Sequence, residues 1–276
     1  MSRDSRSDVP SARRTRVSRR LCRSEARRRL SDARAQSNVV GVALLLGIVV
    51  VSLGSLTAGI GTVVEENAAT ADANRVAADF DAALEPVEAT GVHREQVSFT
   101  EGEVRTVERN LRVLNDSGVV RTVGVDALVF SAGDRRVTFL AGAVVRGTET
   151  GGQMRTPPPI TASRSGGDDG EDDEGVLVVG APKLNGSASV SATGGGSFRL
   201  RTNVTHERER LGNDTFRVAI ETANPDAWRR QFESMNATVT TERFDGDDER
   251  SVVARFPGER VGYVVVHDMR LGVAHG

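Results

Sequence analysis

A single cysteine, Cys22, stands in this chain of 276 residues, so no disulfide can form within the chain. A folded domain must therefore be held together by its hydrophobic core, for which a chain of this length is sufficient. Lysine is equally scarce, because Lys183 is the only lysine among 36 basic residues. The chain uses arginine in place of lysine and is acidic after the N-terminal arm. This composition suggests a GC-rich genome and a high-salt habitat, where carboxylates help to hold water at the protein surface.

Signatures of catalysis are also missing. The sequence has no Walker loop, no G-x-S-x-G elbow and no H-E-x-x-H pair, and its four histidines are scattered at His93, His206, His267 and His275. The acidic run 168–174 lacks the D-x-D-x-D-G spacing of a calcium loop. We therefore expect no enzyme, no catalytic residue, and no cofactor or metal site.

The strongest positive feature is a run of uncharged residues from 35 to 64. Its apolar part, 39–64, reads VVGVALLLGIVVVSLGSLTAGIGTVV. As a helix it would be about 39 Å long, which exceeds the ~30 Å hydrocarbon core of a bilayer. The sequence therefore predicts one transmembrane helix over residues 36–64.

Charge predicts the orientation of that helix. Twelve arginines and only four acidic residues precede residue 38, whereas the rest of the chain is acidic. Basic residues beside a spanning segment are retained in the cytoplasm. We expect the N-terminus inside the cell and the C-terminal domain outside. Because this topogenic role accounts for the basic arm, no nucleic-acid partner is expected.

Asn-x-Ser/Thr sequons support the outward assignment. Such sequons are acceptor sites for surface glycosylation, and none occurs before the apolar run. The five candidates, which would make this a glycoprotein, are Asn115, Asn185, Asn203, Asn213 and Asn236.

The residues before the apolar run, Arg34-Ala35-Gln36-Ser37-Asn38-Val39-Val40-Gly41-Val42, resemble the class III signal of archaellins and archaeal type IV pilin-like proteins. With the alanine-rich stretch that follows, they look like a family of uncharacterised haloarchaeal pilin-like membrane proteins. The resemblance covers about residues 34–84. It implies that a prepilin-type peptidase cuts between Ala35 and Gln36 and removes residues 1–35. Val40 stands where bacterial pilins carry a docking glutamate.

The arm also contains parts of two other export signals. Ser18-Arg19-Arg20-Leu21 resembles a twin-arginine export signal, but further arginines separate it from the apolar run. Cys22 precedes the apolar segment instead of following it, so a lipoprotein signal is excluded.

The helix is expected to continue beyond the membrane over 65–86, and so to run from near Ser37 to Leu84, because Val76, Phe80, Ala83 and Val87 fall on one helical face. Within the membrane, small residues recur four positions apart, a spacing that favours close helix packing in lipid. The pairs are Ala43 with Gly47, Gly54 with Ala58, and Ser55 with Gly59. They suit a pilus core or a homo-oligomer.

After Pro86 the pattern changes to strands and turns. We expect a first β segment over 87–145, a solvated acidic Gly/Pro-rich loop over 146–175, and a second β segment over 176–276. A short helix is expected at 225–235, with Asn224 as its cap and Trp228, Phe232 and Met235 on its apolar side. Asp245–Asp248 is expected to form a hairpin turn. The fold class is α+β, a long transmembrane helix followed by a mainly β, sandwich-like domain with one short helix.

The leading functional hypothesis is a pilin-like single-pass surface protein, a minor or accessory subunit of a type IV pilus-like system. Its expected partners are the membrane, the prepilin-type peptidase and other pilin-like subunits. The alternative is a permanently anchored single-pass protein whose outer domain binds a ligand or partner. A membrane-tethered enzyme is the third and weakest hypothesis.

Overall fold

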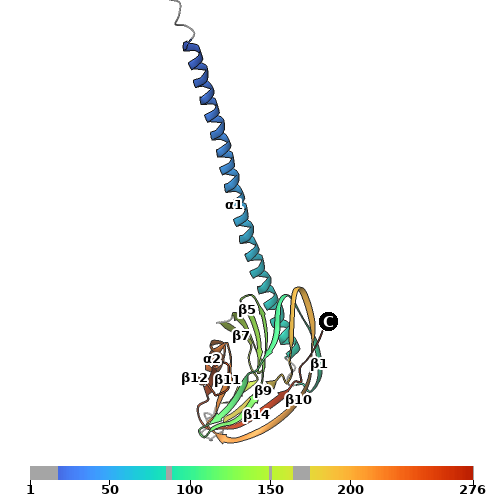
Figure 1. Cartoon of the computed structure of the whole chain (residues 1–276). Coiled ribbons are helices and arrows are strands. Elements are labelled where there is room, and N and C mark those ends of the chain that lie inside the picture. Colours follow the sequence, from blue (N-terminus) through green and yellow to red (C-terminus); the bar gives the residue numbers. More distant parts are fainter. Residues whose placement is uncertain (1–17, 85–88, 149–150, 164–174, 276) are drawn as a thin grey trace, which may run out of the picture. The chain divides into compact units, whose positions relative to one another are not determined.

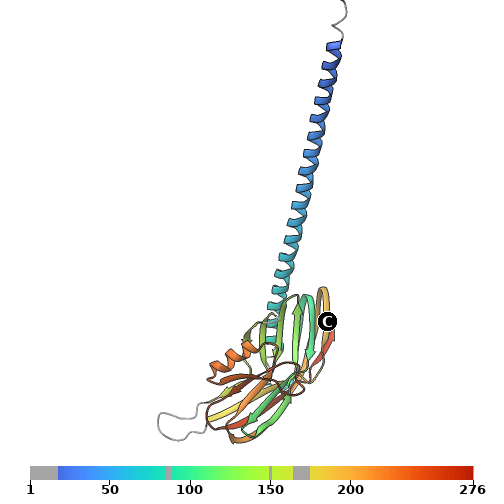
Figure 2. The same cartoon turned by 60° about the vertical axis from the view of Figure 1, so that its left-hand side comes forward.

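The computed structural model describes residues 18–84, 89–148, 151–163 and 175–275, and for residues 18–38 and 275 it describes the backbone alone. The chain divides into two compact units, Met1–Val63 and Val64–Gly276. The first unit contains most of helix α1, and the second contains the end of α1 and all strands (Figures 1 and 2).

Helix α1 covers Ser18–Leu84, a run of 67 residues. The expected start near Ser37 is therefore wrong, because the helix also includes the arginine-rich segment before it. No proline interrupts this range, and the sequence places Pro86 two residues beyond its end. Since the residue before a proline avoids the helical region, Pro86 accounts for where the helix stops.

The second unit is built from two β-sheets and one short helix, which confirms the expected α+β class. The larger sheet has ten strands in the order β7-β6-β5-β4-β1-β10-β14-β9-β8, with β15 paired to β10. Its strands are β1 (Gly91–Val107), β4 (Ala127–Ala132), β5 (Arg135–Leu140), β6 (Ala143–Thr148), β7 (Gly152–Thr156), β8 (Ile160–Ala162), β9 (Gly175–Lys183), β10 (Ser189–Asp214), β14 (Arg260–Asp268) and β15 (Gly272–His275).

The smaller sheet has five strands in the order β12-β13-β11-β2-β3. Helix α2 is Pro225–Ser234, one residue shorter than expected, with proline in its first turn. Asn224 precedes it but makes no side-chain capping hydrogen bond. The strands are β2 (Asn110–Asn115), β3 (Gly118–Gly124), β11 (Arg217–Glu221), β12 (Thr238–Glu242) and β13 (Ser251–Arg255).

One hydrophobic core joins the end of α1 to the larger sheet. Val76 and Phe80 are fully buried in it, as the helical spacing predicts, whereas Val87 lies outside the described residues. Strand β4 is buried on both faces, since Leu128 and Phe130 point into this core while Ala127 and Val129 point into the second. Strands covered on both sides read as continuous apolar runs instead of alternating patterns.

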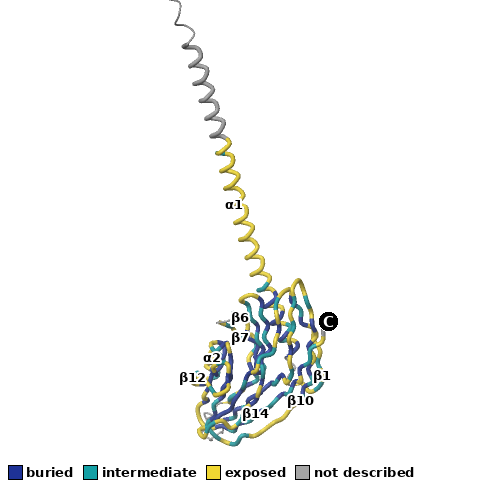
Figure 3. Tube along the Cα trace, viewed as in Figure 1, coloured by how far each residue is buried: buried dark blue, intermediate teal, exposed yellow. Residues whose placement is uncertain are grey.

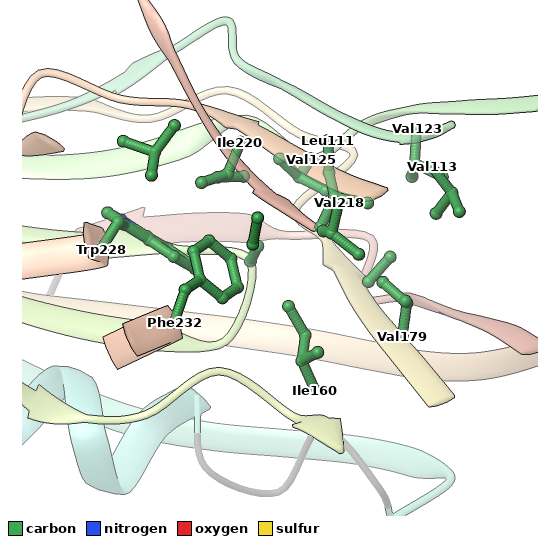
Figure 4. Close-up of a cluster of buried hydrophobic side chains, with 14 of the residues drawn as sticks. Leu111, Val113, Val123, Val125, Ile160, Val179, Val218, Ile220, Trp228 and Phe232 are labelled. Atoms are coloured by element: carbon green, nitrogen blue, oxygen red, sulfur yellow. The ribbon is translucent and has the colours of Figure 1, made fainter. Parts of the chain in front are cut away.

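The second core lies between the two sheets, under α2. It contains Trp228 and Phe232 from the helix, as expected, with Met235 packed against its edge. Figure 4 shows these two rings beside aliphatic side chains of both sheets, including Ile220 and Ile160. Helix α2 therefore covers one side of the core that lies between the two packed sheets.

Strand β10 connects the two halves of the larger sheet. Its first part pairs with β1, from Val204 opposite Gly91 to Ser189 opposite Arg105, and its last part pairs with β14. Strands β14 and β9 pair in parallel, whereas the other strand pairs described are antiparallel. Parallel strands must be joined by a long crossover, and here β10 to β13 lie between β9 and β14 in the sequence. A short turn motif therefore cannot mark this pair.

The expected loop over 146–175 is wrong for most of its described part. Residues 146–148 finish β6, and the segment also contains β7, β8 and Gly175, the first residue of β9. The acidic run 168–174 lies outside the described residues. The Gly and Pro content therefore marked short edge strands and their turns, and not one continuous loop.

An irregularity in β1 is held by a carboxylate from α1. The pairing of β1 with β10 shifts register between Phe99 and Glu101. At this point the Thr100 and Glu101 amides donate to Asp72 Oδ2 at 2.8 and 3.2 Å, and the Thr100 hydroxyl donates to Asp72 Oδ1. Asp72 is buried, so its oxygens replace the partners that the bulge removes from the ladder.

Two further acids of α1 contact the larger sheet. The Ser98 amide donates to Asp79 Oδ2 at 3.1 Å, and the side chains of Arg155 and Thr156 on β7 donate to Asp81. The end of α1 is thus hydrogen-bonded to a central strand of the larger sheet, β1, and to one of its edge strands, β7.

We expect Asp72→Asn to lower the free energy of unfolding by about 1–2 kcal/mol, because the two backbone amides would exchange a charged acceptor for a neutral one, and hydrogen bonds to charged groups are the stronger ones. Chemical denaturation of the detergent-solubilised full chain, followed by near-UV circular dichroism, measures this. Asp134→Asn, at an exposed turn, is the matched control and should change stability by less than about 0.5 kcal/mol. Equal effects of the two substitutions would contradict the role given to Asp72.

Candidate functional site

The first candidate site is the apolar surface of α1. Every residue from Val42 to Val64 is exposed, and an 18-residue window within Val39–Leu84 has a mean hydropathy of 2.7 with none of its residues buried (Figure 3). Within the described residues this is the one helix whose length and composition suit a membrane span. Lipid removes such a surface from water, so the helix is suited to anchor the chain once.

The small residues expected to pack helices lie on one stripe of α1. Ala43, Gly47, Gly54 and Ala58 fall within about 60° around the axis, given 3.6 residues per turn. All four are exposed, and a Cβ added at Gly47 or Gly54 would meet no atom within 4 Å. The Ser55 hydroxyl donates to the Val51 carbonyl at 2.8 Å, so it is already satisfied within the helix.

The expected processing site lies inside α1. Ala35 and Gln36 have helical backbone, and their side chains are outside what the structure describes. A peptidase acts on an extended strand of substrate, so cleavage here would require the helix to open locally.

The five sequons lie in the β domain but differ in accessibility. Asn185, Asn213 and Asn236 are exposed, whereas Asn115 and Asn203 are half-buried. The amide nitrogens of Asn115 and Asn185 donate to the carboxylates of Asp214 and Asp268. Since glycans attach to this nitrogen, these two sites would have to give up a hydrogen bond, and Asn236, in a turn after α2, is easier to reach.

Two histidines that the sequence left apart meet in the structure. His206 and His267 are opposite each other on β10 and β14, with their Nδ1 atoms 2.9 Å apart. His206, but not His267, lines a groove of about 380 Å³ that is also lined by Lys183, the single lysine. Among the described residues no three His, Cys, Asp or Glu side chains come together as a metal site. His93 bonds the Ala89 carbonyl elsewhere in the domain.

A buried ionic network joins β2, β11 and the turn before β13. Arg112 Nη1 and Nη2 donate to both oxygens of Asp247, at 2.8 and 2.5 Å. Nearby, Glu221 accepts from the backbone amides of Asn110 and Asp248. The turn expected at Asp245–Asp248 is present. Its third residue, Asp247, is buried and binds Arg112 on β2, so the turn is attached to the smaller sheet.

Asp247 is perturbed in two opposing directions. Burial raises its pKa, and the hydrogen bonds and charge of Arg112 lower it by more, so the net pKa lies below the ordinary value. No sequence signal marked this pair. The only hint is Arg112 itself, a lone charge in the apolar strand Leu111–Leu114.

We expect Asp247→Asn to destabilise the domain by about 3 kcal/mol at neutral pH, because Arg112 would stay buried with a weaker partner. A carboxylate whose pKa is lowered by folding stabilises above its unfolded pKa, about 3.9, and loses this contribution as pH falls through its folded pKa. The difference in unfolding free energy between the parent and the variant should therefore be largest above about pH 5 and decrease below about pH 4. Urea unfolding at several pH values measures this difference. Asp245→Asn, exposed in the same turn, should leave stability unchanged at every pH, and a difference independent of pH for Asp247→Asn would contradict the assignment.

In a comparison with known protein families, one family model covers both the apolar part of α1 and the β domain. Residues 34–272 match DUF7289, a family of unknown function, and the matched range includes the whole apolar segment and every strand up to the first residue of β15. No curated protein and no solved structure matches the chain. Because the match extends over most of the 276 residues, the chain belongs to DUF7289, a family of unknown function.

Proposed function

We propose that this protein is a pilin-like surface protein, anchored once by α1 and serving as a minor or accessory subunit of a type IV pilus-like system. The observation that carries the proposal is the exposed apolar surface of α1, preceded by the class III-like residues Arg34–Val42. The same helix supplies the apolar anchor and the residues, such as Val76 and Phe80, that enter the core of the β domain.

The proposed orientation has the basic arm in the cytoplasm and the β domain outside the cell. Twelve arginines before the anchor support it, and so does the location of all five sequons in the β domain. The family match begins at residue 34, which supports treating the arm as separate from the rest of the chain.

A minor role is favoured over a bulk one. Major filament subunits tend to be smaller than the chain of about 240 residues that a cut after Ala35 would leave. Val40 also lacks the carboxylate that assists docking in bacterial pilins, so contacts between α1 helices would depend on the small-residue stripe.

A second candidate function is a permanently anchored receptor or binding domain. It is favoured by one observation, a hollow beside the buried Arg260, whose side chain has unpartnered nitrogens.

The processing proposal predicts that the membrane-extracted native protein begins at Gln36. Intact-mass measurement and N-terminal sequencing, in cells with and without the prepilin-type peptidase, would show this. Ala35→Leu should block the cut, because such sites need a small residue before the cut bond, whereas Ala33→Leu, two positions upstream, serves as control. A mature chain that begins near Met1 in cells with the peptidase would leave only the static anchor.

The stripe predicts that Gly54→Leu with Ala58→Leu weakens self-association, because bulky side chains separate the helix backbones. Crosslinking in membranes should show fewer oligomers. Ser52→Leu with Val63→Leu adds bulk on the opposite face of α1 and should leave the oligomers intact. Loss of oligomers in both double variants would show that the stripe has no special role.

A further inference from the structure

An open hollow of about 660 Å³ lies at one end of the sandwich core. Its walls are β8 with Ser163, the last residue of α2 with the two residues after it, and Pro257, Gly258 and Arg260, of which Arg260 begins β14. The volume is in the range of sites for small organic ligands. The lining includes the apolar residues Ile160, Met235 and Pro257 and the polar residues Ser163, Ser234 and Asn236.

Arg260 lines this hollow and is only 4% exposed. Its Nη2 donates to the Pro257 carbonyl at 2.9 Å, but its Nε and Nη1 atoms are buried without a hydrogen-bond partner. Burial also lowers the pKa of the guanidinium, as expected for a charge removed from water. A buried charge left in this state is costly, so native proteins pair it.

The other two buried arginines provide an internal comparison. Arg112 is paired with Asp247, and Arg109 lies 3.6 Å from Glu221. Arg260 is more buried than either, yet none of the carboxylates in the described residues forms an ion pair with it. Arg121 and Arg135, whose Nε atoms are also unbonded, each have a carboxylate oxygen at 3.4 Å. Of the three arginines that are buried in the described part of the chain, Arg260 is thus the one without an ion-pair partner.

We propose that this hollow binds a small organic carboxylate, whose charged group pairs with Arg260 and whose apolar body lies along Ile160, Met235 and Pro257. The guanidinium supplies the charge-assisted donors, and the apolar residues select against bare inorganic anions, which gain nothing from them. Closure of the second core does not depend on the ligand, since Trp228 and Phe232 fill it beneath the hollow.

Thermal unfolding of the detergent-solubilised full chain tests this, with acetate, butanoate and hexanoate as probes at constant ionic strength. Hexanoate at a hundred times its Kd should raise the Tm by roughly 5–10 °C. Affinity should increase up to about fourfold for each added CH₂ group. Hexanamide, which has the same body without the charge, should bind at least roughly tenfold more weakly.

Two variants separate ligand binding from a structural role of the arginine. Arg260→Met should reduce hexanoate affinity roughly ten- to a hundredfold while the ligand-free Tm stays equal or rises, because an unpaired buried charge is removed. Arg260→Lys should retain part of the binding. Arg255→Met, an exposed arginine on β13, is the control and should bind hexanoate like the parent.

Three results would overturn the proposal. The first is no Tm shift by any carboxylate in the parent chain. The second is an equal shift by chloride with no dependence on chain length, which would indicate an inorganic anion only. The third is binding that appears only when the acidic run 168–174 is neutralised, which would mean that the chain's own carboxylates satisfy Arg260. Because none of these outcomes involves the cut after Ala35, the test is independent of the processing experiment.

Discussion

The burial of Val76 and Phe80 against the larger sheet is the contact on which the rest of the domain depends. These two side chains cover the face of β4 that carries Leu128 and Phe130, while the smaller sheet covers the opposite face. Without the helix, strands that are apolar on both faces would expose one of them to water, at roughly 25 cal/mol for each Å² uncovered. The chain has no disulfide within the domain to compensate, since its one cysteine is Cys22. The end of α1 is therefore a structural layer of the β domain as well as the continuation of the anchor.

Polar groups complete what the apolar contacts begin. Asp72 accepts the amides freed by the irregularity in β1, and the Arg112–Asp247 pair closes the smaller sheet at its turn. In each case a carboxylate accepts hydrogen bonds from buried donors that have no partner within the sheet. Buried polar groups in folded proteins generally need such a partner. Arg260 is the exception to this arrangement, and that exception gives the hollow beside it a chemical preference.

The sequence predicted the features that depend on local periodicity. The apolar run 39–64, the buried face with Val76 and Phe80, and helix α2 with Trp228 inward all follow from spacing along one helix. It did not predict features set by pairing between distant strands. The parallel contact of β9 with β14, the meeting of His206 with His267, and the partner of Arg112 depend on register, which no short motif encodes. The unpaired state of Arg260 was also hidden, because a missing partner leaves no trace in the sequence.

The pairing of β10 bears on when the domain can fold. Gly91 near the start of the domain pairs with Val204, and the last strands of the larger sheet pair with residues near its middle. Contacts between such distant residues slow folding, because the intervening chain must be closed into a loop first. A nascent chain therefore cannot complete the larger sheet until β14 has been synthesised. Until then β9 and the last part of β10 lack the strand that both pair with, so the half of the sheet that ends in β8 stays unjoined to the half that contains β1.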